Sequence, residues 1–202
     1  MNTENGFWQF NAGGYSVGTS NATSGSIGIS IADTGTTLLY LPSNVCRAYY
    51  GKIRGAEYNS MQGGYVFPCS TTPPDFHVSI GGKSFKVPGK YINYAPLDQT
   101  GEQCFGGIQP NTGIGLSIFG DIFLKTVLAV FDESTGKPRL GFAPQQWNRI
   151  CMCIGAQRVA RSWALEGFTA NETRGLVAVT HRRSFAMGSR CKYSSIGLDP
   201  PS

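Results

Sequence analysis

The sequence predicts an all-β fold for residues 1–147, with one or two short helices and an irregular C-terminal tail. Three observations predict this fold class. Only 14% of the 202 residues are charged and 27 are glycine, which is typical of proteins rich in strands and turns. The hydrophobic share of 41% is ample for a packed core. Up to about residue 147, short apolar runs alternate with turn-forming residues, and no long helical pattern separates them.

The clearest predicted strands form a hairpin. The segments 76–82 and 83–89 both place apolar residues at alternate positions, and the pair Gly81-Gly82 lies between the alternating parts. Two glycines in that place are typical of a tight β-hairpin turn. The other expected strands are 14–18, 26–33, 65–69, 126–132 and 139–144.

One short helix is expected over 43–53, because its apolar residues fall on one helical face. Ser43 or Asn44 is the expected N-cap, since short polar side chains accept hydrogen bonds from the first free N–H groups of a helix. Gly55 is the expected stop. Cys46 lies inside this segment and is expected to be a small buried hydrophobic residue.

The composition changes after residue 147. Residues 1–147 contain nine basic and nine acidic residues, whereas 148–202 contain eight basic and three acidic ones, so the tail carries the whole net charge of +5. We therefore expect a separate basic tail over 148–202, with a helix over 156–166 and a strand over 176–180. The abrupt change indicates an unspliced intron or a shifted reading frame translated as protein, and a genuine basic extension is the alternative.

The sequence argues against nucleic-acid, membrane and metal-binding functions. No apolar run reaches the roughly 18 residues of a membrane span, and the first residues lack the pattern of a signal peptide. Basic residues are not interleaved with aromatic ones, so no nucleic-acid partner is expected. His77 and His181 lack the spacing of metal ligands, and Cys151-Met152-Cys153 has no further ligand in register. We expect no metal and no other cofactor.

The residues that carry chemistry are Asp33-Thr34-Gly35. Three common residues in this order can also form a plain turn between strands, which is the alternative interpretation. The context favours chemistry, because an apolar strand precedes the motif, the apolar run 36–42 follows it, and Ile118-Phe119-Gly120-Asp121 lies downstream. An Asp at the tip of a tight loop can meet a second carboxylate. Two carboxylates that share one proton titrate apart, so one activates a water while the other protonates a scissile amide.

Five segments together resemble the second, C-terminal lobe of the pepsin-like aspartic endopeptidases, especially the secreted fungal branch of aspergillopepsin and endothiapepsin type. The segments are ADTGTTLLYLP (32–42), GGYVFPCS (63–70), CFGGIQ (104–109), GIGLSIFGD (113–121) and LGFAP (140–144). They agree with the family in order and approximate spacing over roughly 8–145, which a single short motif cannot match in specificity. The resemblance implies the C-terminal lobe of the bilobal pepsin-like fold and cleavage of peptides at acid pH.

The motif residues then receive roles one by one. Asp33 is expected to be one of two catalytic carboxylates. The hydroxyl of Thr34 is expected to orient the loop, and Gly35 lets the backbone approach the carboxylate closely. Contacts with an extended peptide are expected from Gly35, Thr36 and Thr37. The family pattern implies pocket walls at Tyr40, Ile114 and Ile118, for which ordinary core packing is the alternative.

The resemblance also implies a disulfide between Cys69 and Cys104, with two unpaired buried thiols as the alternative. Asp121 follows the Ile-Phe-Gly loop and has a structural role in such proteins. A secreted, extracellular or vacuolar location is implied by the resemblance and by the cysteine pair, although these 202 residues contain no signal peptide.

One departure from the family concerns catalysis, because these 202 residues contain a single Asp-Thr/Ser-Gly motif. The first lobe, its Asp and its flap are expected to be missing, so the chain by itself is expected to have little or no activity. Three interpretations remain. The chain is part of an acid endopeptidase, or two copies pair and each contributes Asp33, or the lobe binds peptides without catalysis. The expected partners are an extended peptide or protein substrate and either the missing lobe or a second copy.

Overall fold

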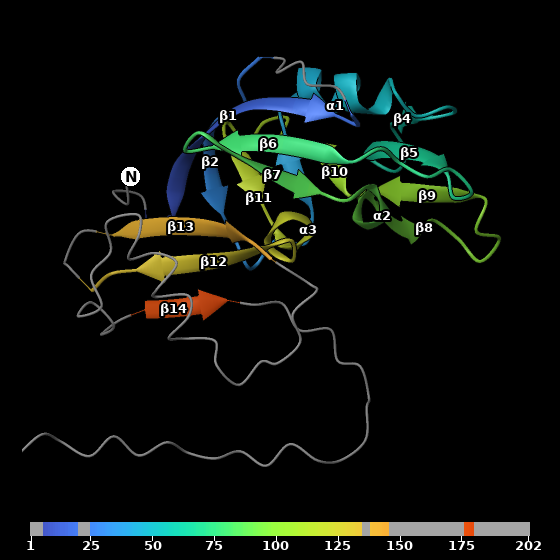
Figure 1. The fold of residues 1–202 in the computed structure, drawn as a ribbon. Helices are drawn as coiled ribbons and strands as arrows, with labels where there is room; N and C mark the ends of the chain where they lie inside the picture. The colour runs from blue at the N-terminus through green and yellow to red at the C-terminus, as the bar shows by residue number, and fades with distance from the viewer. Residues whose placement is uncertain (1–5, 20–24, 135–137, 146–175, 180–202) are drawn as a thin grey trace, which may run out of the picture.

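The computed structural model describes residues 6–19, 25–134, 138–145 and 176–179, and these ranges consist mainly of strands. They form one sheet of seven strands, one of four and one of three. Figure 1 shows the seven-stranded sheet in the upper body, the four-stranded sheet at one end of it and the three-stranded sheet below. The all-β prediction is confirmed.

The seven-stranded sheet contains the predicted hairpin and the strand that leads to Asp33. The hairpin strands pair along their whole length, and Gly81 and Gly82 both have positive φ (58° and 77°), as a type I′ turn requires. The order of the sheet is β10-β3-β11-β2-β1-β6-β7. These strands are β1 (Gln9–Val17), β2 (Gly28–Ala32), β3 (Leu39–Leu41), β6 (Phe76–Ile80), β7 (Lys83–Val87), β10 (Ile108–Pro110) and β11 (Ser117–Phe119).

The predicted disulfide joins two neighbouring strands of the four-stranded sheet. Cys69 follows β5, Cys104 lies on β9, and their sulfur atoms are bonded. A bridge across a separation of 35 residues stabilises a fold by about 3–4 kcal/mol in the chain-entropy model. The sheet has the order β4-β5-β9-β8. Its strands are β4 (Glu57–Asn59), β5 (Gly64–Pro68), β8 (Asn93–Pro96) and β9 (Gln103–Gly106).

The three-stranded sheet has β12 (Val127–Asp132) in the middle, β13 (Arg139–Pro144) on one side and β14 (Leu176–Val179) on the other. β14 corresponds to the strand that the sequence predicts over 176–180. It belongs to the part of the chain that we expected to be a basic tail. The helix expected over 156–166 lies outside the described residues.

The described ranges contain three short helices, one more than the upper expectation: α1 (Ser43–Tyr50), α2 (Gly89–Ile92) and α3 (Asp121–Leu124). The predicted N-cap of α1 is wrong. Pro42 is the N-cap with an extended backbone, and no side chain caps the helix, so the expected caps lie in the first turn instead. Helix α1 also ends before Gly51, whose N–H donates to Arg47 O, rather than at Gly55. None of the helices in the described ranges is long and apolar enough to cross a bilayer.

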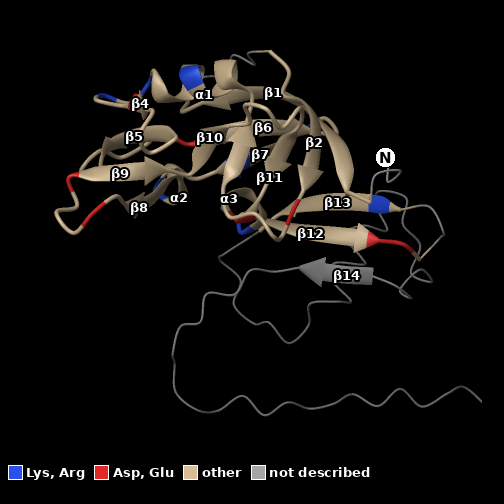
Figure 2. Cartoon of the chain, turned by 180° about the vertical axis from the view of Figure 1, so that it is seen from behind, with Lys and Arg blue, Asp and Glu red and all other residues tan. Residues whose placement is uncertain are grey.

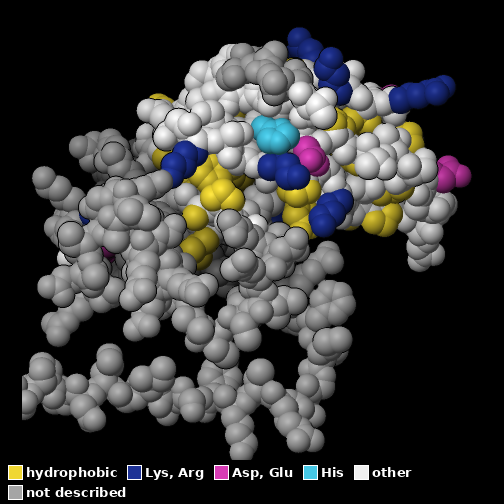
Figure 3. Space-filling model, in the orientation of Figure 1, with side chains coloured by type: hydrophobic (Ala, Val, Ile, Leu, Met, Phe, Trp, Pro, Cys, Tyr) yellow, Lys and Arg dark blue, Asp and Glu magenta, His cyan; other side chains and the backbone are white. Residues whose placement is uncertain are grey.

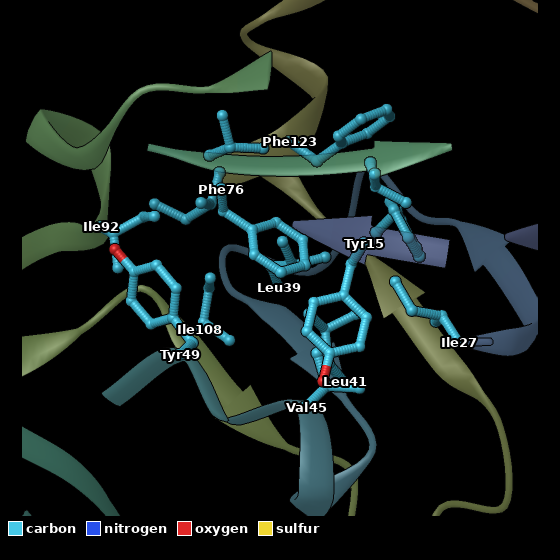
Figure 4. Packing of buried hydrophobic residues seen from close by; sticks show 14 of the residues in the cluster. Tyr15, Ile27, Leu39, Leu41, Val45, Tyr49, Phe76, Ile92, Ile108 and Phe123 are labelled. Atoms are coloured by element: carbon cyan, nitrogen blue, oxygen red, sulfur yellow. The ribbon is translucent and has the colours of Figure 1, made fainter. Parts of the chain in front are cut away.

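The hydrophobic core lies where α1 meets the seven-stranded sheet. Figure 4 shows side chains from α1, from α3 and from several strands converging, among them Leu39, Phe76 and Phe123, which are fully buried. Cys46 is also fully buried, as predicted. Charged residues lie mostly in loops, in the short helices and near strand ends of the described part, and they do not gather at one place (Figure 2). In the view of Figure 3, hydrophobic side chains of the described body reach the surface in separate groups with Lys and Arg between them.

Candidate active site

Asp33 directly follows β2 and begins the loop that leads to β3. This loop lies over β11, because β11 inserts between β2 and β3, parallel to the first and antiparallel to the second. The N–H of Asp33 donates to Phe119 O at the end of β11 (3.2 Å). Two segments far apart in the sequence, the Asp-Thr-Gly loop and the Ile-Phe-Gly loop, therefore lie against each other.

The Asp33 carboxylate is held by donors from its own loop. The Gly35 N–H donates to Oδ1 at 2.8 Å, and the Thr36 hydroxyl donates to Oδ2 at 2.5 Å. An ionised carboxylate has about four acceptor positions, so these two bonds fix its orientation and leave lone pairs free. Asp33 is partly exposed, and Thr34 and Gly35 beside it are exposed. The carboxylate is thus oriented by the protein while remaining accessible to a water or a substrate.

The loop keeps its position through contacts of the backbone with the segment after β11. Asp121 N–H donates to Thr36 O at 2.8 Å, and Ile122 N–H donates to Thr37 O at 3.0 Å. Gly120 passes so close that an added Cβ would lie 2.2 Å from Thr36 O and 2.4 Å from Leu38 O. Only a residue without a side chain fits there. The close passage explains why a glycine is needed after the Ile-Phe pair.

Gly35 shows the same close approach from within the loop. An added Cβ at this residue would lie 3.2 Å from Asp33 Oδ1, which is tight, and its N–H is already bonded to that oxygen. The close approach of the backbone that we expected at Gly35 is present. The expected contacts of Gly35 and Thr37 with a peptide stay predictions. The orienting role of Thr34 likewise stays a prediction.

Thr36 has a contact that the sequence did not reveal, because its hydroxyl donates to the Asp33 carboxylate. The expected contact of Thr36 with a peptide also stays a prediction. The hydroxyl oxygen keeps lone pairs with which it can accept a hydrogen bond from a peptide. The spacing of three residues after the Asp was the available signal, since a hydroxyl at that distance can reach back over a tight loop.

The predicted pocket residues lie on neighbouring elements. Tyr40 on β3 and Ile118 on β11 are directly opposite each other, and Ile31 on β2 is the next residue in the same row. Tyr40 and Ile118 are partly exposed, and Ile114 is 44% exposed in the loop before β11. Core packing, the alternative interpretation, therefore does not describe Ile114. Their role as pocket walls remains a prediction.

A hollow of about 500 Å³ lies beside the other end of β2. Ile29, 52% exposed and four residues before Asp33, forms part of its wall. Leu116 contributes from the loop before β11, and Ser117 contributes from β11 itself. Tyr58 on β4 and Tyr94 on β8 are exposed to a similar degree (52% and 46%). The alternation of the sequence alone does not show which face of β2 is covered. The further lining residues are Ile27, Pro42, Ser43, Asn111, Thr112, Gly113 and Gly115.

Within the described ranges, no group of three or more His, Cys, Asp or Glu side chains is arranged to hold a metal ion. The chemical group that the described residues orient at the site is the Asp33 carboxylate. Cys46 does not contribute a nucleophile, because burial raises the pKa of its thiol to about 12.

The comparison with known protein families shows which family the chain belongs to. The sequence model of the family described as eukaryotic aspartyl protease matches residues 1–145. The chain belongs to the eukaryotic aspartyl protease family. The predicted resemblance to its fungal members is confirmed by the relatives that follow.

Residues of this aspartyl protease chain are 55% identical over 145 positions to Penicillopepsin-2 of Penicillium janthinellum. They are 52% identical to Penicillopepsin-3 of the same organism and 55% identical to Aspergillopepsin-1 of Aspergillus fumigatus, again over 145 positions. Each match covers 72% of this chain but only 36% of the relative. The chain thus spans about a third of the length of these curated relatives.

Proposed function

We propose that this chain supplies one of the two catalytic carboxylates of an acid endopeptidase, and that it acts together with a second lobe bearing the other. The observation that carries the proposal is the Asp33 carboxylate, which Gly35 N–H and Thr36 hydroxyl orient at a partly exposed position. Membership of the aspartyl protease family supports it. The second lobe belongs either to a longer form of this chain or to a separate chain.

In the proposed reaction, Asp33 and its partner carboxylate share one proton, because two adjacent carboxylates cannot both ionise easily. The ionised carboxylate takes a proton from a water, whose oxygen forms a bond to the scissile carbonyl carbon. The protonated carboxylate gives its proton to the carbonyl oxygen. The carboxylate that gave up its proton then takes one from a hydroxyl of the tetrahedral intermediate, while the other carboxylate gives its proton to the amine nitrogen. The carbon–nitrogen bond breaks, the amine leaves, and the pair again shares one proton.

The proposed substrate is an extended peptide or protein segment with apolar residues. Tyr40 and Ile118 present a partly apolar surface on the strands next to the Asp33 loop, and Ile114 is exposed nearby in sequence. Extended peptides suit such a site because their alternate side chains can enter pockets on one side. The disulfide between Cys69 and Cys104 supports a secretory, oxidising compartment for the protein.

The test is cleavage of a denatured protein substrate at acid pH by the purified 202-residue chain, with and without an added first lobe of Penicillopepsin-2. We expect little or no cleavage by the chain alone and cleavage when the lobe is added. Asp33→Asn should abolish the cleavage, because an amide cannot take a proton from water. Asp98→Asn, the same chemical change in the exposed turn after β8, is the matched control and should remain active.

Each outcome separates the three interpretations. Efficient cleavage by the chain alone that disappears in Asp33→Asn would mean that two copies pair their carboxylates. Cleavage that survives Asp33→Asn in either mixture would refute the proposed role of this residue. Binding of a peptide without cleavage, unchanged by Asp33→Asn in the presence of the first lobe, would instead identify a non-catalytic peptide-binding module.

A further inference from the structure

Four phenylalanine rings from four different elements form a closed cluster beside the Asp33 loop. The members of this phenylalanine cluster are Phe10 on β1, Phe119 on β11, Phe123 in α3 and Phe142 on β13. Each ring meets two others edge to face, with ring centroids 4.9–5.4 Å apart around the cycle. Such pairs are favourable because the positive edge of one ring meets the negative face of the next. The position of each ring is therefore coupled to the positions of its two neighbours.

Phe119 joins the phenylalanine cluster to the Asp33 loop. Its carbonyl oxygen accepts the hydrogen bond from Asp33 N–H at 3.2 Å, and the residue is paired with Ala32, directly before Asp33. The Phe119 side chain is fully buried, so the packing of the neighbouring rings sets where it lies. A displacement of this ring would move the carbonyl group that holds the Asp33 backbone.

Helix α3 provides a second connection between the cluster and the loop. The N–H groups of Asp121 and Ile122 donate to the loop at the start of the helix, and the fully buried Phe123 follows them. At the other end, the Thr126 hydroxyl donates to Phe123 O at 2.7 Å, and Thr126 O accepts the Gln145 N–H just after β13. Figure 1 shows α3 next to β11 and β12. The helix thus links the three-stranded sheet to the Asp33 loop.

Phe142 is the ring that the three-stranded sheet contributes to the cluster. It pairs with Ala129 of β12, and its ring contacts Phe10 and Phe123, the same two rings that contact Phe119. Phe142 therefore lies across the cycle from Phe119. It is partly exposed, so a smaller side chain can replace it without leaving a closed void in the centre of the core.

We propose that Phe142 is a positioning residue for Asp33. Its ring holds Phe10 and Phe123 against Phe119, and the carbonyl oxygen of Phe119 holds the Asp33 backbone where the carboxylate can meet its partner. A small misplacement of a reacting group costs rate even when the change lies far from the chemistry. The catalytic consequence rests on the function proposed above, whereas the effect on the position of the loop does not.

The first test uses the full chain without any partner. Phe142→Leu removes the ring, and Phe105→Leu, the same change at a partly exposed position on β9, is the matched control. Amide hydrogen exchange is followed by NMR. In Phe142→Leu we expect the amides of Asp33, Asp121 and Ile122 to exchange about tenfold faster relative to the amides of β5, which report the stability of the rest of the fold. The control should leave the exchange of the three loop-binding amides unchanged.

Two outcomes of this test would overturn the proposal. One is unchanged exchange of the three amides in Phe142→Leu. The other is an equal acceleration at these amides and at β5, because the ring would then contribute to overall stability alone.

The second test measures cleavage by the full chain mixed with the first lobe of Penicillopepsin-2. We expect Phe142→Leu to lower kcat about tenfold and to change KM less than about twofold, because the interaction lost is one that matters in the transition state. Phe142→Tyr keeps the ring and should restore kcat. A raised KM with unchanged kcat would overturn the positioning role, as would a Phe142→Tyr variant as slow as Phe142→Leu. If the parent mixture does not cleave, the proposed function fails, and the exchange experiment still decides whether Phe142 positions the loop.

Discussion

Gly120→Ala is the substitution for which the structure predicts the largest local effect. The added Cβ would lie 2.2 Å from Thr36 O and 2.4 Å from Leu38 O, whereas ordinary contacts begin at 3.4 Å. The Asp33 loop and the segment after β11 must therefore separate by about 1 Å, because both neighbours are backbone atoms and cannot rotate away. Such a movement breaks the hydrogen bonds from Asp121 N–H and Ile122 N–H to the loop.

The expected cost combines two contributions. Overpacking of a close contact costs about 1–3 kcal/mol, and two lost backbone hydrogen bonds cost about 1 kcal/mol each. We expect Gly120→Ala to lower the free energy of unfolding by about 3–5 kcal/mol, a large part of the roughly 5–15 kcal/mol of a typical domain. Urea unfolding followed by tryptophan fluorescence measures it, and the midpoint should fall by about 2 M for a slope near 2 kcal/mol/M.

Gly13→Ala is the matched control, because its added Cβ would lie 3.3 Å from Ser79 O, so a shift of a few tenths of an ångström relieves it. We expect this control to lose less than about 1 kcal/mol. If Gly120→Ala were as stable as Gly13→Ala, the close passage of the two loops described above would be refuted. The same result would remove the reason given for the glycine after Ile118-Phe119.

Two further predictions concern titratable groups. Burial raises the pKa of Asp132, but hydrogen bonds from Ser134 and Arg139 outweigh it and hold the pKa below its usual value. Since the folded pKa is lowered, the stabilisation is present above the unfolded pKa and is lost as pH falls through the folded pKa. Asp132→Asn should therefore weaken the fall of the unfolding free energy at acid pH, and should destabilise the chain at neutral pH by about 3 kcal/mol. Urea unfolding at several pH values measures both effects, and an unchanged fall at acid pH would contradict the prediction. Cys46, with a buried thiol of pKa about 12, should resist iodoacetamide in the folded chain and react only after unfolding, as peptide mass spectrometry can show; rapid alkylation under native conditions would contradict its burial.

The sequence predicted the sheet class and the hairpin correctly because both follow from local patterns. Alternation of apolar residues fixes which strand face is buried, and two glycines with positive φ make the turn. Six short strands were not predicted, since three or four residues are too few to show a period; they are β3, β4, β8, β9, β10 and β11. The N-cap of α1 was predicted wrongly because Pro42 provides the extended backbone that begins the helix one residue earlier.

The candidate site could be located by sequence alone, because Asp33-Thr34-Gly35 and Ile118-Phe119-Gly120-Asp121 are local motifs. Their meeting could not be derived from local physics, since 84 residues separate Asp33 from Ser117 and only the insertion of β11 between β2 and β3 brings them together. The same holds for the row formed by Ile31, Ile118 and Tyr40, which crosses three strands.

By itself, the sequence determined the all-β class, the family, the identity of the candidate carboxylate and the cysteines that form the bridge. These features depend on residue types and on spacing along the chain. The tertiary structure alone decided that Thr36 rather than a distant residue holds the second oxygen of Asp33, that Gly120 must lack a side chain, and that β14 pairs with β12 on the side away from β13. Each of these depends on distances between backbone segments, which are set by packing of the whole fold and leave no periodic signal in the sequence.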